Sequence, residues 1–484
     1  MKKFEREIEA FIKDFVKDLR EKNVCVFAGA GLSKQAGYVN WPDLLRDIAD
    51  EIGLSVDVEH DLISLAQYHV NESGGSKAKI VKKILEEFSE QAEETQNHKI
   101  LSRLPISAFW TTNYDTLIED SLKKVNKIVD VKYDVDQLSH IKPKRDAVVY
   151  KMHGDVNHPS KSILTKEQYE EYYRTHEFFI TALSGDLISK TFLFLGFSFT
   201  DPNLDYVLSR LRLRFHGNMR QHYTFMKKVT QGRDSDEIYT YNIRKQELRV
   251  NDLKRYGIKV LMVDDYDVIT DVLIEIENRF KTSTVFISGS AEDYGHIGKE
   301  AAQVFIHKLS KEIITNGFNI VNGFGWGVGS AVINGSLEGI YEKPDKFSQD
   351  QLTIRPFPQF ETGKKKLPEL WQEYRENMIS LAGVILIVFG NKKVIDATSG
   401  NEVIVNADGV FKEFEIAIAK GLVPIPVPST GFVAKEIYEK VLLKKDQYFI
   451  NKDVIPFLEK LADNKISEKE IIEIIIDVIK KINI

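Results

Sequence analysis

Residues 23–33, NVCVFAGAGLS, decide how the chain begins to fold. The apolar run from Val24 to Ala28 is typical of a buried strand, and the glycines after it favour a sharp turn into a helix. Glycine lets a backbone approach a pyrophosphate closely, and the N-terminus of the next helix offers unpaired N–H groups to negative charge. The layout indicates a phosphate-binding βα unit. A glycine-rich turn with no ligand role would explain the same residues.

The same pattern recurs downstream, where an apolar run ends in a polar or small residue before a loop or helix. It is found at residues 106–115 (ISAFWTTNYD), 147–155 (AVVYKMHGD) and 191–205 (TFLFLGFSFTDPNLD), and residues 257–283 add one more strand and a helix. Ligands of open α/β sheets bind at the carboxyl ends of the strands. We therefore expect four strand ends to line one cleft.

A second α/β unit begins at residues 284–291 (TVFISGSA). Its further strands are expected within residues 318–332, 383–390 and 422–427, with a helix at 411–421. We predict an α/β protein of two Rossmann-like domains, residues 1–282 and 283–484.

Both ends of the chain read as amphipathic helices, at residues 4–19 and 468–484. The first helix packs on its own domain or forms a contact in an oligomer. The 484 residues carry a net charge of −6, which weighs against a chain built to neutralise nucleic-acid phosphates. The longest dense apolar stretch, 384–389, is far shorter than the roughly 20 residues of a membrane helix, and residues 1–23 lack the apolar run of a secretory signal. We expect a cytoplasmic protein without a membrane or nucleic-acid partner.

Four of these elements together resemble the sirtuin family. They are a Gly-Ala-Gly-x-Ser loop, an Asn-x-Asp element, a His-Gly element and a later Gly-x-Ser, in that order within about the first 280 residues. The resemblance implies a parallel sheet that binds NAD as the substrate. The residues it places around the NAD pyrophosphate, the nicotinamide and the adenosine side are Ala28, Gly29, Ala30, Gly31 and Ser33, then Asp115, then Gly196 and Ser198.

The resemblance also implies two catalytic residues. Asn113 orients the water or the ribose at the scissile C1′–N bond, and His153 accepts a proton, for which an imidazole is suited. Each residue has a structural alternative. Asn113 caps the helix that follows it, and His153 is simply a hydrogen-bonded residue at a strand end.

The sequence departs from protein-deacylating sirtuins in two places. Cys25 is the single cysteine, so a four-cysteine zinc module is excluded and we expect no bound metal. Trp41 is followed by Pro42, where the family's substrate loop has an arginine after its aromatic residue. Water then becomes the natural acceptor, which predicts hydrolysis of NAD to nicotinamide and ADP-ribose. An NAD-dependent protein deacylase is the alternative.

The second unit resembles the SLOG family of Rossmann-like nucleotide binders. Its two glycine loops are followed by Arg375 and Lys392, and residues 407–415 (ADGVFKEFE) keep Gly409 and Glu415 but lack the full glycine element of hydrolytic members. The resemblance therefore favours signal binding over catalysis. The expected contacts are Gly289, Ser290, Gly323, Gly325, Gly327, Arg375, Lys392 and Glu415. Glu413 in place of Glu415, and a surface role for both basic residues, stay open.

A sirtuin-like domain followed by a SLOG domain resembles the effectors of the bacterial Thoeris anti-phage system. This resemblance implies a cyclic ADP-ribose isomer as the activating ligand, made by a TIR-domain protein that need not touch the effector. It also implies a homo-oligomer, a tetramer, whose rearrangement gates the active site.

Overall fold

The computed structural model describes residues 4–59, 61–88, 92–215, 219–361, 363, 365–398, 400–449, 451–463 and 465–483. The chain forms two compact units, Lys2–Glu277 and Asn278–Ile484, which divide inside one helix. No helix in the described ranges has the length and apolar character needed to cross a bilayer.

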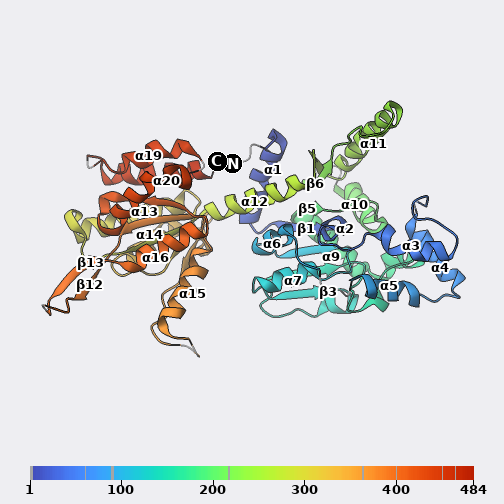
Figure 1. Cartoon of the computed structure of the whole chain (residues 1–484), viewed down its shortest axis with the longest axis horizontal. Helices are drawn as coiled ribbons and strands as arrows, with labels where there is room; N and C mark the ends of the chain where they lie inside the picture. Colours follow the sequence, from blue (N-terminus) through green and yellow to red (C-terminus); the bar gives the residue numbers. More distant parts are fainter. Residues whose placement is uncertain are drawn as a thin grey trace. The chain divides into compact units, whose positions relative to one another are not determined.

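The first unit is built on a seven-stranded parallel sheet in the order β3-β4-β2-β1-β5-β6-β7 (Figure 1). Its strands are β1 (Val24–Ala28), β2 (Ala108–Thr111), β3 (Val129–Lys132), β4 (Ala147–Lys151), β5 (Thr191–Leu195), β6 (His222–Lys227) and β7 (Ile258–Val263). The order places β4, β2, β1 and β5 side by side, so the four predicted strand ends are neighbours at one edge.

Helices and short 3-10 turns accompany this sheet, and the last helix, α12, runs on into the second unit. They are α1 (Arg6–Arg20), α2 (Ala30–Lys34), α3 (Trp41–Glu51), α4 (Leu62–Glu72), α5 (Ala78–Phe88), α6 (Gln96–Arg103), α7 (Leu117–Lys124), η1 (Val135–Ser139), η2 (Pro159–Lys161), α8 (Lys166–Thr175), α9 (Glu177–Ser189), α10 (Pro202–Phe215), α11 (Asp236–Lys254) and α12 (Asp267–Thr282).

The two faces of the sheet are covered by different helices because strand side chains alternate. Cys25 and Phe27 of β1 share a core with α8, α9 and α10. Val26, on the opposite face, lies beside α6 and α7. The predicted N-terminal helix packs within its own unit, because Phe11 of α1 stacks near Tyr223 of β6 with ring centroids 4.6 Å apart.

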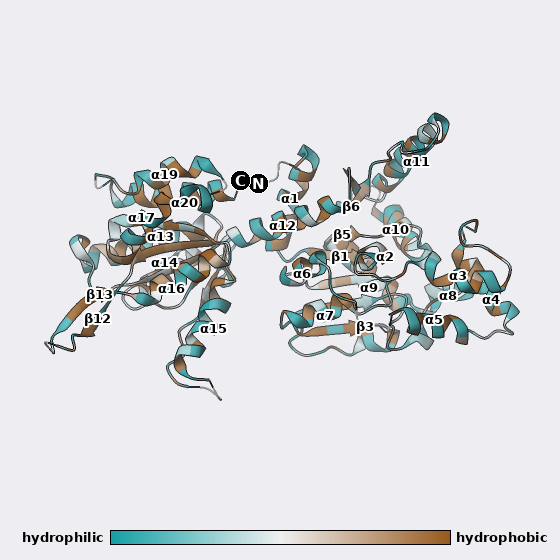
Figure 2. Cartoon of the chain, viewed as in Figure 1, coloured by the Kyte–Doolittle hydropathy of each residue, from teal (hydrophilic) through white to brown (hydrophobic). Residues whose placement is uncertain are grey.

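The second unit has a five-stranded parallel sheet in the order β10-β9-β8-β11-β14 and a separate antiparallel hairpin, β12-β13. The strands are β8 (Thr284–Ser290), β9 (Asn319–Asn322), β10 (Leu352–Ile354), β11 (Val384–Phe389), β12 (Asn391–Ile395), β13 (Glu402–Asn406) and β14 (Val423–Pro426). The inner strand β11, between β8 and β14, is buried along its whole length. Figure 2 shows the strands of this sheet as a hydrophobic layer between its helices.

The helices and short turns of the second unit follow the same α/β alternation. They are η3 (Gly295–Ile297), α13 (Lys299–Thr315), α14 (Gly329–Glu342), η4 (Gln349–Gln351), α15 (Leu367–Ile379), α16 (Asp408–Ala419), η5 (Pro428–Thr430), α17 (Phe432–Leu443), α18 (Lys445–Tyr448), η6 (Lys452–Val454), α19 (Ile455–Lys460) and α20 (Glu468–Ile482). Two α/β units with parallel sheets confirm the predicted fold class.

Candidate active site

A cavity of about 560 Å³ opens at the carboxyl ends of β1, β2, β4 and β5. Residues that follow all four strands line it, as the sequence predicts. Its wall includes Ala30, Gly31, Ser33, Asn113, Asp115, His153, Gly196 and Ser198. Ala28 and Gly29 are not among the residues that line the cavity, and both are buried.

The glycine loop after β1 packs backbone against backbone on the loop after β5. The N–H groups of Gly29 and Gly31 donate to the carbonyl groups of Leu195 and Gly196, both at 2.9 Å. A Cβ on Gly29 would lie 2.5 Å from the Gly196 oxygen, and one on Gly31 would lie 2.8 Å from the Gly196 Cα. Both glycines are therefore required by this contact, and neither of their N–H groups is free for a phosphate.

Asn113 follows β2 and points its amide at the glycine loop. Its Nδ2 donates to the carbonyl of Gly29 at 3.1 Å and to the hydroxyl of Ser33 at 2.9 Å. The helix-cap alternative for Asn113 is wrong, because α7 begins after Thr116. With Nδ2 committed, Oδ1 is the atom of Asn113 that is left to accept from a bound molecule.

His153 follows β4 and is buried on the cavity wall, with a polar side chain near each ring nitrogen. Its Nδ1 lies 3.2 Å from the hydroxyl of Tyr169 in α8. Its Nε2 lies 3.1 Å from Oδ2 of Asp201. Neither Asp201 nor Tyr169 is among the predicted site residues, although both lie against the imidazole and orient it.

Asp201 stands at the start of α10, where its Oδ1 accepts from the backbone N–H of Leu204 at 2.9 Å. Burial raises the pKa of this carboxyl, but the attraction of His153 and the hydrogen bonds it accepts outweigh burial, so its pKa is lowered overall. Asp201 is therefore a carboxylate that orients His153, an arrangement that favours one imidazole tautomer.

Asp115 is a second buried carboxylate of the wall. Its Oδ1 accepts from the N–H of Leu117 at 3.1 Å. Its Oδ2 has no hydrogen-bond partner among the described residues. A buried oxygen of this kind calls for a donor from a ligand.

The helices inserted between β1 and β2 supply an apolar wall opposite these polar groups. Trp41, Pro42, Leu44 and Leu62 line the cavity from α3 and α4. Asn40 caps α3 by accepting from the N–H of Asp43, with Pro42 in the first turn. The departure Trp41-Pro42 is thus the start of a helix that covers the site.

In the second unit, a buried ionic cluster lies around Arg375 of α15. Its Nε is 3.6 Å from Oε1 of Glu413 and is a buried atom without a hydrogen-bond partner in the described part of the chain, while its guanidinium stands 4.8 Å from the ring centre of Phe357. Ser288 donates to Glu413 at 2.5 Å. Burial raises the pKa of Glu413, against the opposing effects of Ser288 and Arg375. Glu415 is exposed, so the structure brings Glu413 to Arg375 instead.

The glycines of the second unit allow close packing of the chain around them. Added Cβ atoms on Gly325 and Gly327 would each lie 2.0 Å from a backbone oxygen of the β8 end, and one on Gly289 would lie 2.4 Å from the oxygen of Val388. Gly323 faces side chains of Phe357 and Met378, and the hydroxyl of Ser290 donates to the carbonyl of Asn391 at 3.0 Å. Lys392 pairs with Asp408 at the surface.

No cluster of three or more metal-ligating side chains occurs among the residues that the structure describes. Cys25 is buried in β1, and its thiol donates to the carbonyl of Ala108 at 3.1 Å. Burial raises the pKa of this thiol well above its usual value. Cys25 is a packing residue of the core.

The chain is a two-domain protein in which a SIR2-like domain precedes a SLOG domain. The model of the SIR2-like domain matches residues 107–246, and that of the Sir2- and TIR-associating SLOG family matches residues 268–482. The chain belongs to the ThsA family of NAD(+) hydrolases.

The family assignment rests on similarity along nearly the whole chain. The NAD(+) hydrolase ThsA of Bacillus cereus (strain MSX-D12) is 49% identical over 476 residues, covering 98% of both chains. The NAD(+) hydrolase ThsA of Acinetobacter baumannii (strain 532279) is 45% identical over 482 residues, covering 99% of this chain and 100% of that one. Defense-associated sirtuin 2 of Bacillus subtilis is 24% identical over 62% of this chain and 30% of its own length.

Proposed function

We propose that residues 1–282 hydrolyse NAD to nicotinamide and ADP-ribose in the cavity at the strand ends. The observation that carries the proposal is the convergence of Asn113 and His153, from β2 and β4, on the same wall as the glycine loop. The names of the close relatives support NAD as the substrate. No metal takes part in the proposed reaction.

The nicotinamide end of NAD lies against Asp115, whose partnerless Oδ2 accepts from the carboxamide N–H₂. The pyrophosphate lies along the segment from Ala28 to Ser33, with Ala30, Gly31 and Ser33 at the wall. Gly196 and Ser198 contact the adenosine side. These placements fill the cavity from β2 to β5.

In the reaction, water attacks C1′ of the ribose as the C1′–N bond to nicotinamide breaks. Oδ1 of Asn113 accepts a hydrogen bond from that water, and the proton leaves toward His153. Asp201 holds the imidazole and stabilises it when it becomes charged. The apolar wall from α3 and α4 excludes bulk water. The alternative function is that of a protein deacylase, but a chain with a single cysteine cannot form the four-cysteine zinc module of protein-deacylating sirtuins.

The test compares nicotinamide release by Asn113→Ala and His153→Ala with that of the parent protein. We expect each to fall by roughly 10²- to 10⁴-fold, the usual contribution of groups acting in the transition state. His158→Ala is the matched control, since His158 is exposed five residues beyond His153. A parental rate in either cavity variant would show that the site is misplaced.

We propose that residues 283–484 bind the activating signal, a cyclic ADP-ribose isomer made by a TIR-domain protein that need not touch this chain. The support is the buried Nε of Arg375, which has no hydrogen-bond partner in the described part of the chain and faces a carboxylate and an aromatic ring. A guanidinium in this state suits a phosphate, and Glu413 suits ribose hydroxyls. The backbone at Gly289, Ser290, Gly323, Gly325 and Gly327, with Lys392 at the rim, completes the site.

A ligand titration tests this role. Arg375→Ala should raise the concentration of cyclic ADP-ribose isomer needed for half-maximal NAD cleavage and leave the plateau unchanged. The control is Lys469→Ala, which removes one positive charge at an exposed position of α20. Identical curves for Arg375→Ala and the parent would show that Arg375 is not part of the signal site.

The protein acts as a cytoplasmic homotetramer in this proposal.

A further inference from the structure

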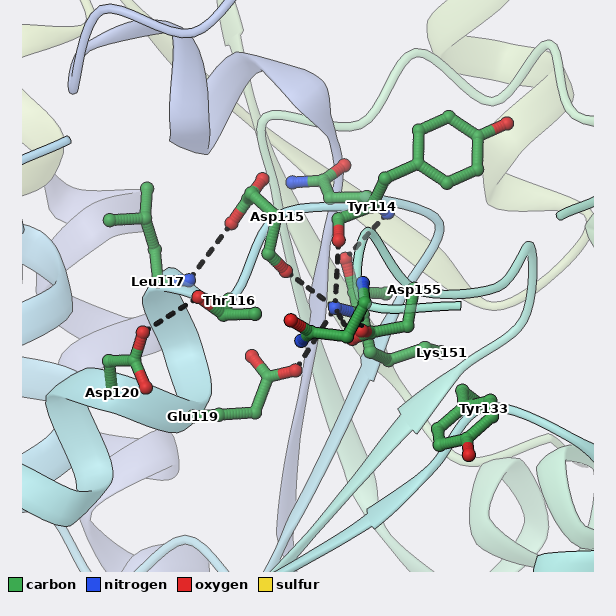
Figure 3. A network of polar contacts seen from close by, with 12 residues as sticks. Tyr114, Asp115, Thr116, Leu117, Glu119, Asp120, Tyr133, Lys151 and Asp155 are labelled. Carbon is green, nitrogen blue, oxygen red and sulfur yellow. Dashed lines mark hydrogen bonds and ion pairs between the residues drawn. The ribbon is translucent and has the colours of Figure 1, made fainter. Parts of the chain in front are cut away.

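A buried lysine next to the cavity is not used by the proposed reaction. Lys151 ends β4, and its side chain is 0% exposed. Its Nζ donates to the carbonyl oxygens of Tyr114 at 3.0 Å and Asp115 at 2.6 Å, and to Oδ2 of Asp155 at 2.5 Å (Figure 3). Oε1 of Glu119 lies 3.1 Å from the same nitrogen.

The ammonium keeps its charge in this position. Burial lowers the pKa of Lys151, but the attraction of Glu119, Asp155 and Asp115 outweighs burial, so its pKa is raised overall. Burial raises the pKa of Glu119, and Lys151 opposes that shift only in part. If Lys151 served only to neutralise acidic side chains, its N–H groups would donate only to carboxylates. Two of them donate instead to main-chain carbonyls.

Those carbonyls belong to the loop that carries the reacting groups of β2. Asn113 precedes Tyr114 directly, and Asp115 contributes its own partnerless carboxylate oxygen to the cavity wall. Lys151 is the last residue of β4 and precedes His153 by two residues. One ammonium thus ties the loop after β2 to the end of β4, just before His153.

We propose that Lys151 is a positioning residue for NAD cleavage, which sets the place of Asn113 and Asp115 in the cavity by holding the carbonyls of Tyr114 and Asp115. This inference rests on the proposed NAD hydrolysis. Displacements of about 1 Å between reacting groups cost on the order of 100-fold in rate.

The position of Lys151 predicts which end of the substrate is affected. The loop it holds faces the nicotinamide end, whereas Gly196 and Ser198 belong to the loop after β5, which Lys151 does not contact among its hydrogen bonds and ion pairs in the described residues. Loss of Lys151 should reduce kcat and weaken inhibition by nicotinamide. The affinity for ADP-ribose, which lacks nicotinamide, should stay near the parental value.

The experiment compares Glu119→Gln with the double variant Lys151→Met/Glu119→Gln in the full-length protein. The first variant removes one carboxylate of a buried pair and keeps the bonds of Lys151 to the two carbonyls and to Asp155, so nicotinamide release should stay near the parental rate. The second removes those bonds without leaving Glu119 as an unpaired charge. We expect its kcat to fall about 100-fold with an ADP-ribose Kd, measured by calorimetry, within about threefold.

Three outcomes would overturn the positioning role. They are a double variant with parental kcat, an equal loss of kcat in both variants, and a loss of ADP-ribose binding that accompanies the loss of kcat. If the double variant does not fold, the double variant Lys151→Gln/Glu119→Gln replaces it in the comparison with Glu119→Gln. The amide introduced at position 151 can donate to one of the two carbonyls. A parent protein that releases no nicotinamide at any signal concentration contradicts NAD hydrolysis itself. An active parent with an equally active Lys151 variant contradicts only this inference.

Discussion

Gly196 follows β5 at the point where two loops meet, and Gly196→Ala tests how tightly the loops around the cavity are packed. Its φ is +63°, a left-handed conformation that costs an L-residue about 1–2 kcal/mol. An added Cβ would lie 2.2 Å from the nitrogen of Leu32 and 2.6 Å from the carbonyl carbon of Gly31. Both neighbours are backbone atoms, so the loops themselves must separate.

The size of the effect follows from this geometry. Ordinary Cβ contacts lie at 3.4–4 Å, so the two loops must move apart by about 1 Å. Overpacking of this kind costs about 1–3 kcal/mol, and with the backbone term the free energy of unfolding should fall by about 2–5 kcal/mol. For a unit of this size, Tm should drop by roughly 5–15 °C. The 2.9 Å hydrogen bond from Gly31 to Gly196 lengthens at the same time.

Thermal melting by circular dichroism and calorimetric titration with ADP-ribose measure both consequences. The matched control is Gly185→Ala in α9, where an added Cβ meets no atom within 4 Å. Because alanine is favoured over glycine in a helix by about 0.5–1 kcal/mol, this control should keep or raise Tm. A Gly196→Ala protein that melts and binds ADP-ribose like the parent would refute the packing argument.

Two further predictions concern titratable groups. Asp201→Asn should lower kcat by about 10- to 100-fold, because a charge-assisted contact to His153 contributes about 1.5–3 kcal/mol, while Asp205→Asn, outside the cavity wall, should keep the parental rate; equal rates in all three proteins would remove Asp201 from the site. His222 is buried in β6, and burial, with the charge of Arg220, lowers its pKa to about 4. The unfolded chain therefore binds the proton more readily between pH 6.5 and 4, so stability falls as pH falls through that window, by on the order of 3 kcal/mol at most. His222→Asn should flatten this slope in chemical denaturation, and an unchanged slope contradicts the assignment.

The centre of each sheet could be predicted from the sequence because its strands are buried on both faces. Such strands appear as unbroken apolar runs, as at 24–28 and 384–389, and both are fully buried. The meeting of four strand ends in one cavity follows from parallel order, since all carboxyl ends lie at one edge. The prediction of the fold class is confirmed for these reasons.

The edge strand β3 and the hairpin β12-β13 could not be predicted in this way. In β3, Asp130 and Lys132 are buried polar residues that neutralise each other at 2.8 Å, which hides the apolar pattern of the strand. The hairpin β12-β13 alternates exposed and half-buried residues outside the main sheet. A strand whose pairing compensates its polarity gives no signal in the sequence alone.

The residues that contact the site side chains could not be predicted from the sequence either. Tyr169 and Asp201 reach His153 from two different helices, and Glu119 reaches Lys151 from a third. No local spacing links residues that lie so far apart along the chain. The sequence motifs gave the residues at the strand ends, and only the fold shows what holds their side chains.

The glycine loops of the two units do not by themselves indicate which chemistry each unit performs. In both units the glycines allow backbone to approach backbone, and in the first unit the N–H groups of Gly29 and Gly31 are already used in that contact. Such loops are therefore expected in any tightly packed pair of neighbouring strand ends, whether or not a ligand binds. What separates the two units is their side chains, since one carries an amide and an oriented imidazole and the other a buried guanidinium beside a carboxylate. The proposed hydrolysis in the first unit depends on Asn113 and His153, and the proposed signal binding in the second depends on Arg375. Variants at these positions therefore test the two proposed roles.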